Sequence, residues 1–303
     1  MKNGDRIRSR VLRGVALNRQ PGFHFPGNFL DVSFDHVARD ASRLSVAPGP
    51  WCAGADGQTD FGSLALLADL ALAACMRAHL GRATRLATVS MHLQFTGAAR
   101  VGRLVAEGVF QSFLDGASGK LGMSRVTVEG KAGQVCYGSG TFMALAPPKN
   151  MTLHPVPLRN RKSPEPLRLK NDGNLALEEQ KILGWADAAL AARGVFIENF
   201  WGIRPRHGEG ALENGLHVGN RVGHAQGGIL LALAAATAGT ALPANWRMSG
   251  ISAWYISPGE GRTLHASSKV IHHGRLTAVV RTQITGKSRR RVLEVVTTHC
   301  AGA

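Results

Sequence analysis

The strongest candidate for chemistry in this sequence is Asp69, a carboxylate in an otherwise apolar run. Its neighbours at helical spacing are Ala65, Leu66, Leu72 and Ala73. A helix here would turn the carboxylate toward its apolar side, where desolvation raises the pKa of a carboxyl group and makes it a better base or nucleophile. The alternative is a structural Asp satisfied by a nearby hydroxyl or backbone group, but Asp is seldom fully buried without a reason.

A second group of polar residues, the stretch NRVGHAQGG from Asn220 to Gly228, precedes another apolar run. Asn220 carries a donor and an acceptor that suit an attacking water or a carbonyl oxygen, although local sequence alone favours a turn Asn. Gly227 would begin a helix, where unpaired N–H groups stabilise a developing oxyanion; a plain tight turn is the alternative. We expect Gln226, Gly228 and His224 to contact the substrate beside it. The apolar run itself carries no reacting group, which must come from elsewhere.

Both groups belong to a repeat. Apolar runs that begin at Asp60 and at Gln226 each start with a polar residue and a Gly-containing step, and each precedes four segments with partial period-two alternation. The segments predicted as strands are 86–97, 102–113, 121–130 and 134–145, then 247–259, 262–273, 275–286 and 290–300. The pattern predicts two copies of an antiparallel sheet packed on a helix.

Composition and spacing divide the chain into two domains. We predict a first domain over residues 1–148, a basic, Pro-rich linker over 149–180 and a second domain over 181–303, with a short helix around 175–193. The basic residues of the linker are interpreted as a solvated connector. The alternative is that some of them meet ligand phosphates.

The overall composition favours a folded protein with an anionic small-molecule partner. The 303 residues are 44% hydrophobic and carry a formal net charge of +16. Only 6% are aromatic and none interleave with basic residues, so nucleic acid is the weaker interpretation. Runs 64–76 and 227–242 are too short to cross a bilayer, which argues against membrane insertion. The four separated cysteines indicate free thiols in a reducing cytoplasm, and no metal site is expected.

A long helix entered through a Gly step and wrapped by an antiparallel sheet resembles the hotdog fold. The segment DFGSLALLAD from Asp60 is similar to the helix motif of acyl-CoA thioesterases of the 4-hydroxybenzoyl-CoA and phenylacetate-pathway type. The resemblance covers most of residues 28–146 and 195–300. It implies an α+β double hotdog, with two antiparallel sheets each wrapped on a long central helix and packed as an internal pseudo-dimer.

In that family a His-Gly-Gly step opens the helix, an acid lies nine positions after the His, and an amide lies six positions before it. In the first half the acid position is Asp69, but the step has become Asp60, Phe61 and Gly62, and the amide position is Gly54. This half therefore keeps only the acid.

The second half departs from the family pattern in the opposite way. Its step is Gln226, Gly227 and Gly228 and its amide is Asn220, whereas its acid position is Ala235. Because paired hotdog domains share their active sites, the resemblance implies one complete site, built from the acid of the first half and the amide and Gly step of the second.

The resemblance further implies a cytoplasmic acyl-CoA thioesterase that releases a carboxylic acid and CoA, needs no cofactor or metal, and forms a homodimer. Some relatives carry a Ser after the first strand, where this chain has Thr96 and Ser257, and Thr96 is the better substrate-binding candidate. The basic run 287–291 would contact CoA phosphates or form an exposed turn. Two alternatives stay open, namely a hotdog enoyl-CoA hydratase or dehydratase and a non-catalytic acyl-CoA-binding sensor.

Overall fold

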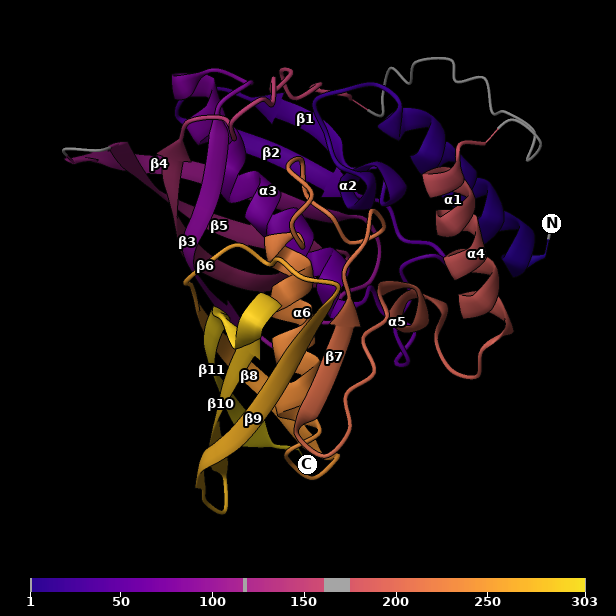
Figure 1. Cartoon of the computed structure of the whole chain (residues 1–303). Coiled ribbons are helices and arrows are strands. Elements are labelled where there is room, and N and C mark those ends of the chain that lie inside the picture. Colours follow the sequence, from indigo (N-terminus) through magenta and orange to yellow (C-terminus); the bar gives the residue numbers. More distant parts are fainter. Residues whose placement is uncertain (1, 117–118, 161–174, 303) are drawn as a thin grey trace.

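The computed structural model describes residues 2–116, 119–160 and 175–302, and one antiparallel sheet of eleven strands runs through this part of the chain (Figure 1). The first half contributes β1 (Ser33–Val37), β2 (Ala41–Val46), β3 (Arg85–Phe95), β4 (Leu104–Gly116), β5 (Gly119–Gly130) and β6 (Gly133–Leu145). The second half contributes β7 (Glu209–Glu213), β8 (Trp246–Tyr255), β9 (Thr263–His273), β10 (Thr277–Thr285) and β11 (Arg291–Ala301).

The two halves join edge to edge. The strand order is β1-β2-β4-β5-β6-β3-β8-β11-β10-β9-β7, so β3 and β8 form the seam, with Leu93 opposite Ile251. The eight predicted strands are all present, but the two expected sheets are parts of one. Pairing β3 with β8 satisfies backbone N–H and C=O groups that two separate sheets would leave at open edges.

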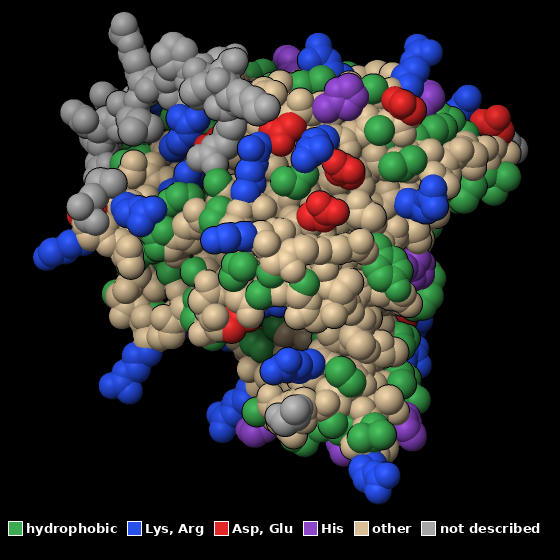
Figure 2. Space-filling model, turned by 180° about the vertical axis from the view of Figure 1, so that it is seen from behind, with side chains coloured by type: hydrophobic (Ala, Val, Ile, Leu, Met, Phe, Trp, Pro, Cys, Tyr) green, Lys and Arg blue, Asp and Glu red, His purple; other side chains and the backbone are tan. Residues whose placement is uncertain are grey.

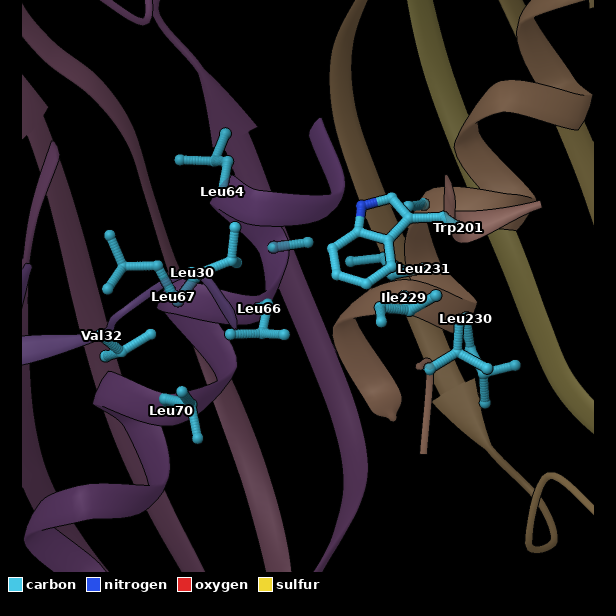
Figure 3. Packing of buried hydrophobic residues seen from close by; sticks show 14 of the residues in the cluster. Leu30, Val32, Leu64, Leu66, Leu67, Leu70, Trp201, Ile229, Leu230 and Leu231 are labelled. Carbon is cyan, nitrogen blue, oxygen red and sulfur yellow. The ribbon is translucent and has the colours of Figure 1, made fainter. Parts of the chain in front are cut away.

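Two apolar helices, α3 (Phe61–Leu80) and α6 (Gly227–Gly239), pack against each other and against the sheet (Figure 1). The leucines of α3 and the apolar residues at the start of α6 meet in the buried core, together with Trp201 (Figure 3). By length and composition α3 could cross a membrane, yet 83% of its most apolar window is buried inside the fold. Both apolar runs are buried core helices as expected, but the expectation that the first is too short to span a bilayer is wrong, because α3 extends beyond residues 64–76 to 20 residues.

Each core helix begins at a side-chain cap, which explains where it starts. The Asp60 carboxylate accepts the Ser63 N–H at the start of α3, and the Gln226 side chain accepts the Ile229 N–H at the start of α6. The two caps occupy matching positions of the repeat. They place Asp69 in the middle of α3 and Gly227 at the first position of α6.

Four further helices form a layer beside the sheet (Figure 1). They are α1 (Asn3–Asn18), α2 (Phe25–Phe29), α4 (Leu177–Ala191) and α5 (Phe196–Trp201). Phe29 of α2 packs against α5, with its ring 5.0 Å from Phe200 and 5.7 Å from Trp201, and Trp201 in turn reaches Gly62 of α3. The helix predicted around 175–193 is confirmed as α4. Of the predicted linker, residues 161–174 lie outside the described residues.

Candidate active site

Asp69 is held at the meeting point of the two halves. Its side chain is 7% exposed, and its two carboxylate oxygens accept hydrogen bonds from opposite halves of the chain. Thr88 Oγ1, on β3, donates to Oδ1 over 3.0 Å, and Gln226 Nε2, at the start of α6, donates to Oδ2 over 2.8 Å. The structure therefore brings together the acid of the first half and the helix entrance of the second.

The side-chain amide of Gln226 has one orientation that satisfies both of its partners, Asp69 and the Ile229 N–H. Gln226 Oε1 accepts the Ile229 N–H over 3.1 Å, which caps α6, and this contact leaves Nε2 to face Asp69. Turning the amide over would place a donor against the Ile229 N–H and an acceptor against the carboxylate. The cap of α6 therefore determines how Gln226 holds the acid.

Burial gives Asp69 the properties of a base. Desolvation raises the pKa of this carboxyl from 3.8 to about 6, against the opposing effects of the Thr88 hydrogen bond, the positive charge of Arg77 and the Gln226 hydrogen bond. At neutral pH the group is ionised, yet it accepts a proton more readily than an exposed Asp does. Both properties are required of a general base that works near neutrality.

The other side of the site is formed by the first residue of α6. A Cβ on Gly227 would lie 3.3 Å from Tyr255 Cε1 and 3.5 Å from Thr88 Oγ1, so the missing side chain leaves this approach open. The Tyr255 hydroxyl donates to the Gly227 carbonyl over 2.9 Å. Burial, and then the charge of Asp69, raise the pKa of Tyr255, which keeps the phenol protonated. The Tyr255 hydroxyl thus fixes the first residue of α6, which lines the same cavity as Asp69 at the positive end of the helix dipole.

These groups line one cavity of about 430 Å³. Asp69, Thr88, Gln226, Gly227 and Tyr255 all contribute to its wall. Most of the remaining wall is apolar, and it comes from α3, β3, β6, the segment 153–158 of the predicted linker, the segment 23–37 and the loops beside α6 and β8. The cavity is large enough for a small acyl group, and it surrounds the buried carboxylate with apolar side chains.

Asn220 and His224 also line this cavity. The Asn220 Oδ1 atom accepts the N–H groups of Val222 and His224 over 2.9 and 3.1 Å, so the side chain shapes its own loop and has its Nδ2 group left for a ligand. His224 Nε2 lies 3.3 Å from Glu260 Oε1, and burial lowers the pKa of the imidazole. His224 thus pairs with Glu260.

Two residues predicted to bind substrate lie elsewhere. Thr96 follows the end of β3, does not line the cavity, and donates its hydroxyl to the carbonyls of Gln134 and Val135. Gly228 faces α3, where a Cβ would come within 2.5 Å of the Leu66 nitrogen. The role of Gly228 is close helix packing, and the hydroxyl near the acid belongs to Thr88.

Thr88 and Tyr255 are the site residues that the sequence did not reveal. Thr88 lies within β3, where Thr is common for its β-propensity, and Tyr255 ends β8. Neither belongs to a motif. Ser257, matched to Thr96 in the repeat, does line the cavity, but its hydroxyl donates to the Arg291 carbonyl.

The matching position in the other half lacks the acid and the open glycine. A second cavity of about 470 Å³ is lined by Gly54, Asp60 and Phe61, and α6 contributes Ala232 and Ala236 to it. The acid position is Ala235, and Phe61 replaces the open glycine and packs edge-on against Phe95. Within the described residues, only one of the two related positions therefore has both a carboxylate at the acid position and a glycine directly after the helix cap.

The basic run 287–291 does not reach the cavity. It forms an exposed turn, η2 (Lys287–Arg289), between β10 and β11, as one of its two interpretations predicted. On the face shown in Figure 2, Lys and Arg side chains are spread over the surface and do not gather in one patch.

The sheet, the two core helices and the position between them define a double hotdog protein. No family model and no curated protein sequence matches the chain. A conserved protein with a hot dog fold from Alicyclobacillus acidocaldarius is similar to it in structure, with a TM-score of 0.51 and 9% identity over 90% of this chain and 96% of that one.

Two solved structures whose names include thioesterase share this fold. The 12:0-ACP thioesterase from Umbellularia californica has a TM-score of 0.52 and 11% identity, covering 86% of this chain and 93% of its own. A protein from Lactobacillus plantarum named as a candidate oleoyl thioesterase has a TM-score of 0.53 and 9% identity, covering 87% and 97%. Because the matches extend over both halves, the likeness shows a tandem hotdog fold over most of the chain.

Proposed function

We propose that this protein is an acyl-CoA thioesterase with one composite active site per chain. The observation that carries the proposal is the hydrogen bond between Asp69 of the first half and Gln226 of the second, inside an apolar cavity. A desolvated carboxylate beside a helix N-terminus suits attack on a thioester. Solved structures with the same fold include proteins named as thioesterases, which is consistent with this chemistry.

In the proposed reaction, Asp69 takes a proton from a water molecule as the oxygen of that water attacks the thioester carbon. The N–H of Gly227 stabilises the negative charge that forms on the carbonyl oxygen, and the Nδ2 group of Asn220 orients the water or the substrate. The carbon–sulfur bond then breaks, and the proton held by Asp69 passes to the departing CoA thiolate. The products are a carboxylic acid and CoA, and the carboxylate is ionised again.

Direct attack by Asp69 is the other course that the geometry allows. The carboxylate would form a mixed anhydride with the acyl group, and water would then hydrolyse it. A single turnover in water labelled with oxygen-18 distinguishes the two courses. General-base catalysis leaves Asp69 unlabelled, whereas hydrolysis of the anhydride at the Asp69 carbonyl would leave label in the protein.

The experiment that tests the function is release of free thiol from a panel of acyl-CoAs. We expect turnover by the natural chain and loss of turnover in Asp69→Asn. The matched control is Asp60→Asn, which changes a second buried carboxyl whose pKa is also about 6 and which caps α3 at the position matching Gln226. Saturable acyl-CoA binding without thiol release, or hydration of an enoyl-CoA, would contradict the proposal.

A further inference from the structure

Arginine side chains gather in the same cavity as Asp69. Arg77, Arg82, Arg85 and Arg221 all line it, from α3, the start of β3 and the loop before α6. Arg82 is exposed, but Arg77 and Arg221 lie deeper. In the described chain, neither of these two lies within 4 Å of a carboxylate oxygen, although the charge of Asp69 acts on Arg77, and the Nε atom of Arg77 is fully buried without a hydrogen-bond partner. Two desolvated cations beside each other are unfavourable unless an anion joins them.

A third donor faces the same region. His24 is 6% exposed and lines the cavity, and its Nδ1 atom accepts the Gly27 N–H over 3.1 Å, so the ring proton is on Nε2. Burial, followed by the charges of Arg77 and Arg221, lowers the pKa of this imidazole to about 3. His24 is therefore a neutral N–H donor close to two guanidinium groups. The cluster of His24, Arg77 and Arg221 offers donors to an anion.

The position of the cluster relative to Asp69 indicates which anion it fits. Arg77 follows Asp69 by eight residues on α3, a rise of about 12 Å along the same helix face. Helical side chains lean toward the N-terminus, so the Arg77 guanidinium extends back toward the acid. Between them α3 lines the cavity with Leu70, Ala73 and Ala74. An acyl chain whose thioester carbon is at Asp69 would thus pass an apolar wall and end at the cluster.

We propose that the cluster of His24, Arg77 and Arg221 binds a carboxylate at the far end of the acyl group. This inference rests on the proposed thioesterase function and assigns its substrate class, thioesters of dicarboxylic acids. A planar guanidinium pairs with a carboxylate through two parallel hydrogen bonds, and the neutral His24 adds a third donor. An uncharged acyl chain would leave Arg77 with only the charge of Asp69 acting on it and Arg221 without an ion pair, which selects against such a chain.

Two other roles for these arginines fit the structure less well. Neutralising Asp69 is not their main role, because both carboxylate oxygens already accept hydrogen bonds and the pKa of Asp69 stays raised. Binding the phosphates of CoA suits the exposed Arg82 better, since phosphate groups are strongly hydrated and Arg77 Nε is closed to solvent. The main chain also fixes Arg221, whose Nη2 donates to the His154 carbonyl over 2.6 Å.

The test compares adipoyl-CoA with hexanoyl-CoA, which match in chain length and differ in the terminal carboxylate. We expect the natural chain to have the higher kcat/KM for adipoyl-CoA. In Arg77→Met, which keeps an apolar stem without the charge, the ratio of the two kcat/KM values should fall about 10- to 100-fold, the range for losing a hydrogen bond to a charged group. Arg82→Met is the matched control, and its ratio should stay at that of the natural chain.

The adipoyl and hexanoyl thioesters of N-acetylcysteamine, which lacks the phosphates of CoA, show whether the arginines bind the acyl carboxylate or the CoA phosphates. An Arg77→Met defect that is equal for both acyl groups on CoA and absent on N-acetylcysteamine would overturn the proposal in favour of phosphate binding. Should Arg77→Met fail to fold, inhibition of the natural chain decides the question. Adipate should compete with substrate far better than hexanoate, and equal inhibition would refute the carboxylate site. Absence of any turnover would instead refute the thioesterase function.

Discussion

Replacing Asp69 with Asn should abolish thioester hydrolysis and, at neutral pH, make the protein more stable. The change removes the charge and keeps the size of the side chain. The Asn oxygen can accept from Gln226 Nε2, and its amide can donate to the Thr88 hydroxyl, which is able to act as an acceptor. The local hydrogen bonds therefore survive, while the proton acceptor for water is lost. Loss of a general base lowers turnover by about 10²- to 10⁴-fold.

The gain in stability follows from the raised pKa of Asp69. The folded chain holds its proton up to a pH of about 6, whereas in an unfolded chain the group ionises near 3.8. Between these values the folded state binds more protons, so raising the pH lowers the free energy of unfolding. The difference in pKa corresponds to roughly 3 kcal/mol, which is present in full only above about pH 7. Asn cannot ionise, so Asp69→Asn escapes this cost.

Urea unfolding at several pH values measures the effect directly. The free energy of unfolding of Asp69→Asn, relative to the natural chain, should rise from near zero at low pH to roughly 3 kcal/mol above pH 7. Asp60→Asn should show a similar pH dependence, because burial also raises the pKa of Asp60 to about 6, but it should keep thiol release. A pH-independent difference, or lower stability of Asp69→Asn at pH 8, would refute the desolvated base.

Three further outcomes follow from the same contacts. In the natural chain, kcat/KM should fall as the pH drops below about 6, since protonated Asp69 cannot accept a proton, and an unchanged rate at pH 5 would contradict this assignment. Gln226→Leu should lower the free energy of unfolding, measured in urea, by about 1 kcal/mol because α6 loses its cap. It should also move the acid limb of the pH profile of kcat/KM to higher pH, because Asp69 loses a hydrogen bond that lowers its pKa. Gly228→Ala should destabilise the fold by about 1–3 kcal/mol, because its Cβ would press on Leu66. Gly227→Ala should mainly lower turnover. Equal losses of stability in the two variants would be inconsistent with this packing.

Much of the fold could be predicted because its elements repeat. The core helices correspond to two long apolar runs and the eight predicted strands show partial period-two alternation, and each of these eight strands lies within a few residues of its predicted range. The strands β1, β2 and β7 were missed because they have only five or six residues, too few to establish a period. Helix α1 was also missed, although Ile7, Val11 and Val15 are spaced as one buried helix face.

The site could be predicted only where a motif position had lost its functional residue in one half and kept it in the other. Asp69 and Gln226 occupy two such positions, and the structure connects them by a hydrogen bond. Thr88 could not be predicted in this way, since a hydroxyl on a strand gives no local signal. Thr96 lies eight residues further along, a distance of about 26 Å in an extended strand, so an error of position within one strand moved the predicted hydroxyl out of the cavity.

The seam between β3 and β8 has a consequence for how many substrates the protein processes at once. A symmetric dimer of single hotdog domains carries two equal sites, and every substitution in its gene changes both. Here one peptide chain contains both partners, so each half can lose what the other supplies. Titration with a tight-binding inhibitor should therefore find one equivalent per chain of 303 residues, whatever the assembly.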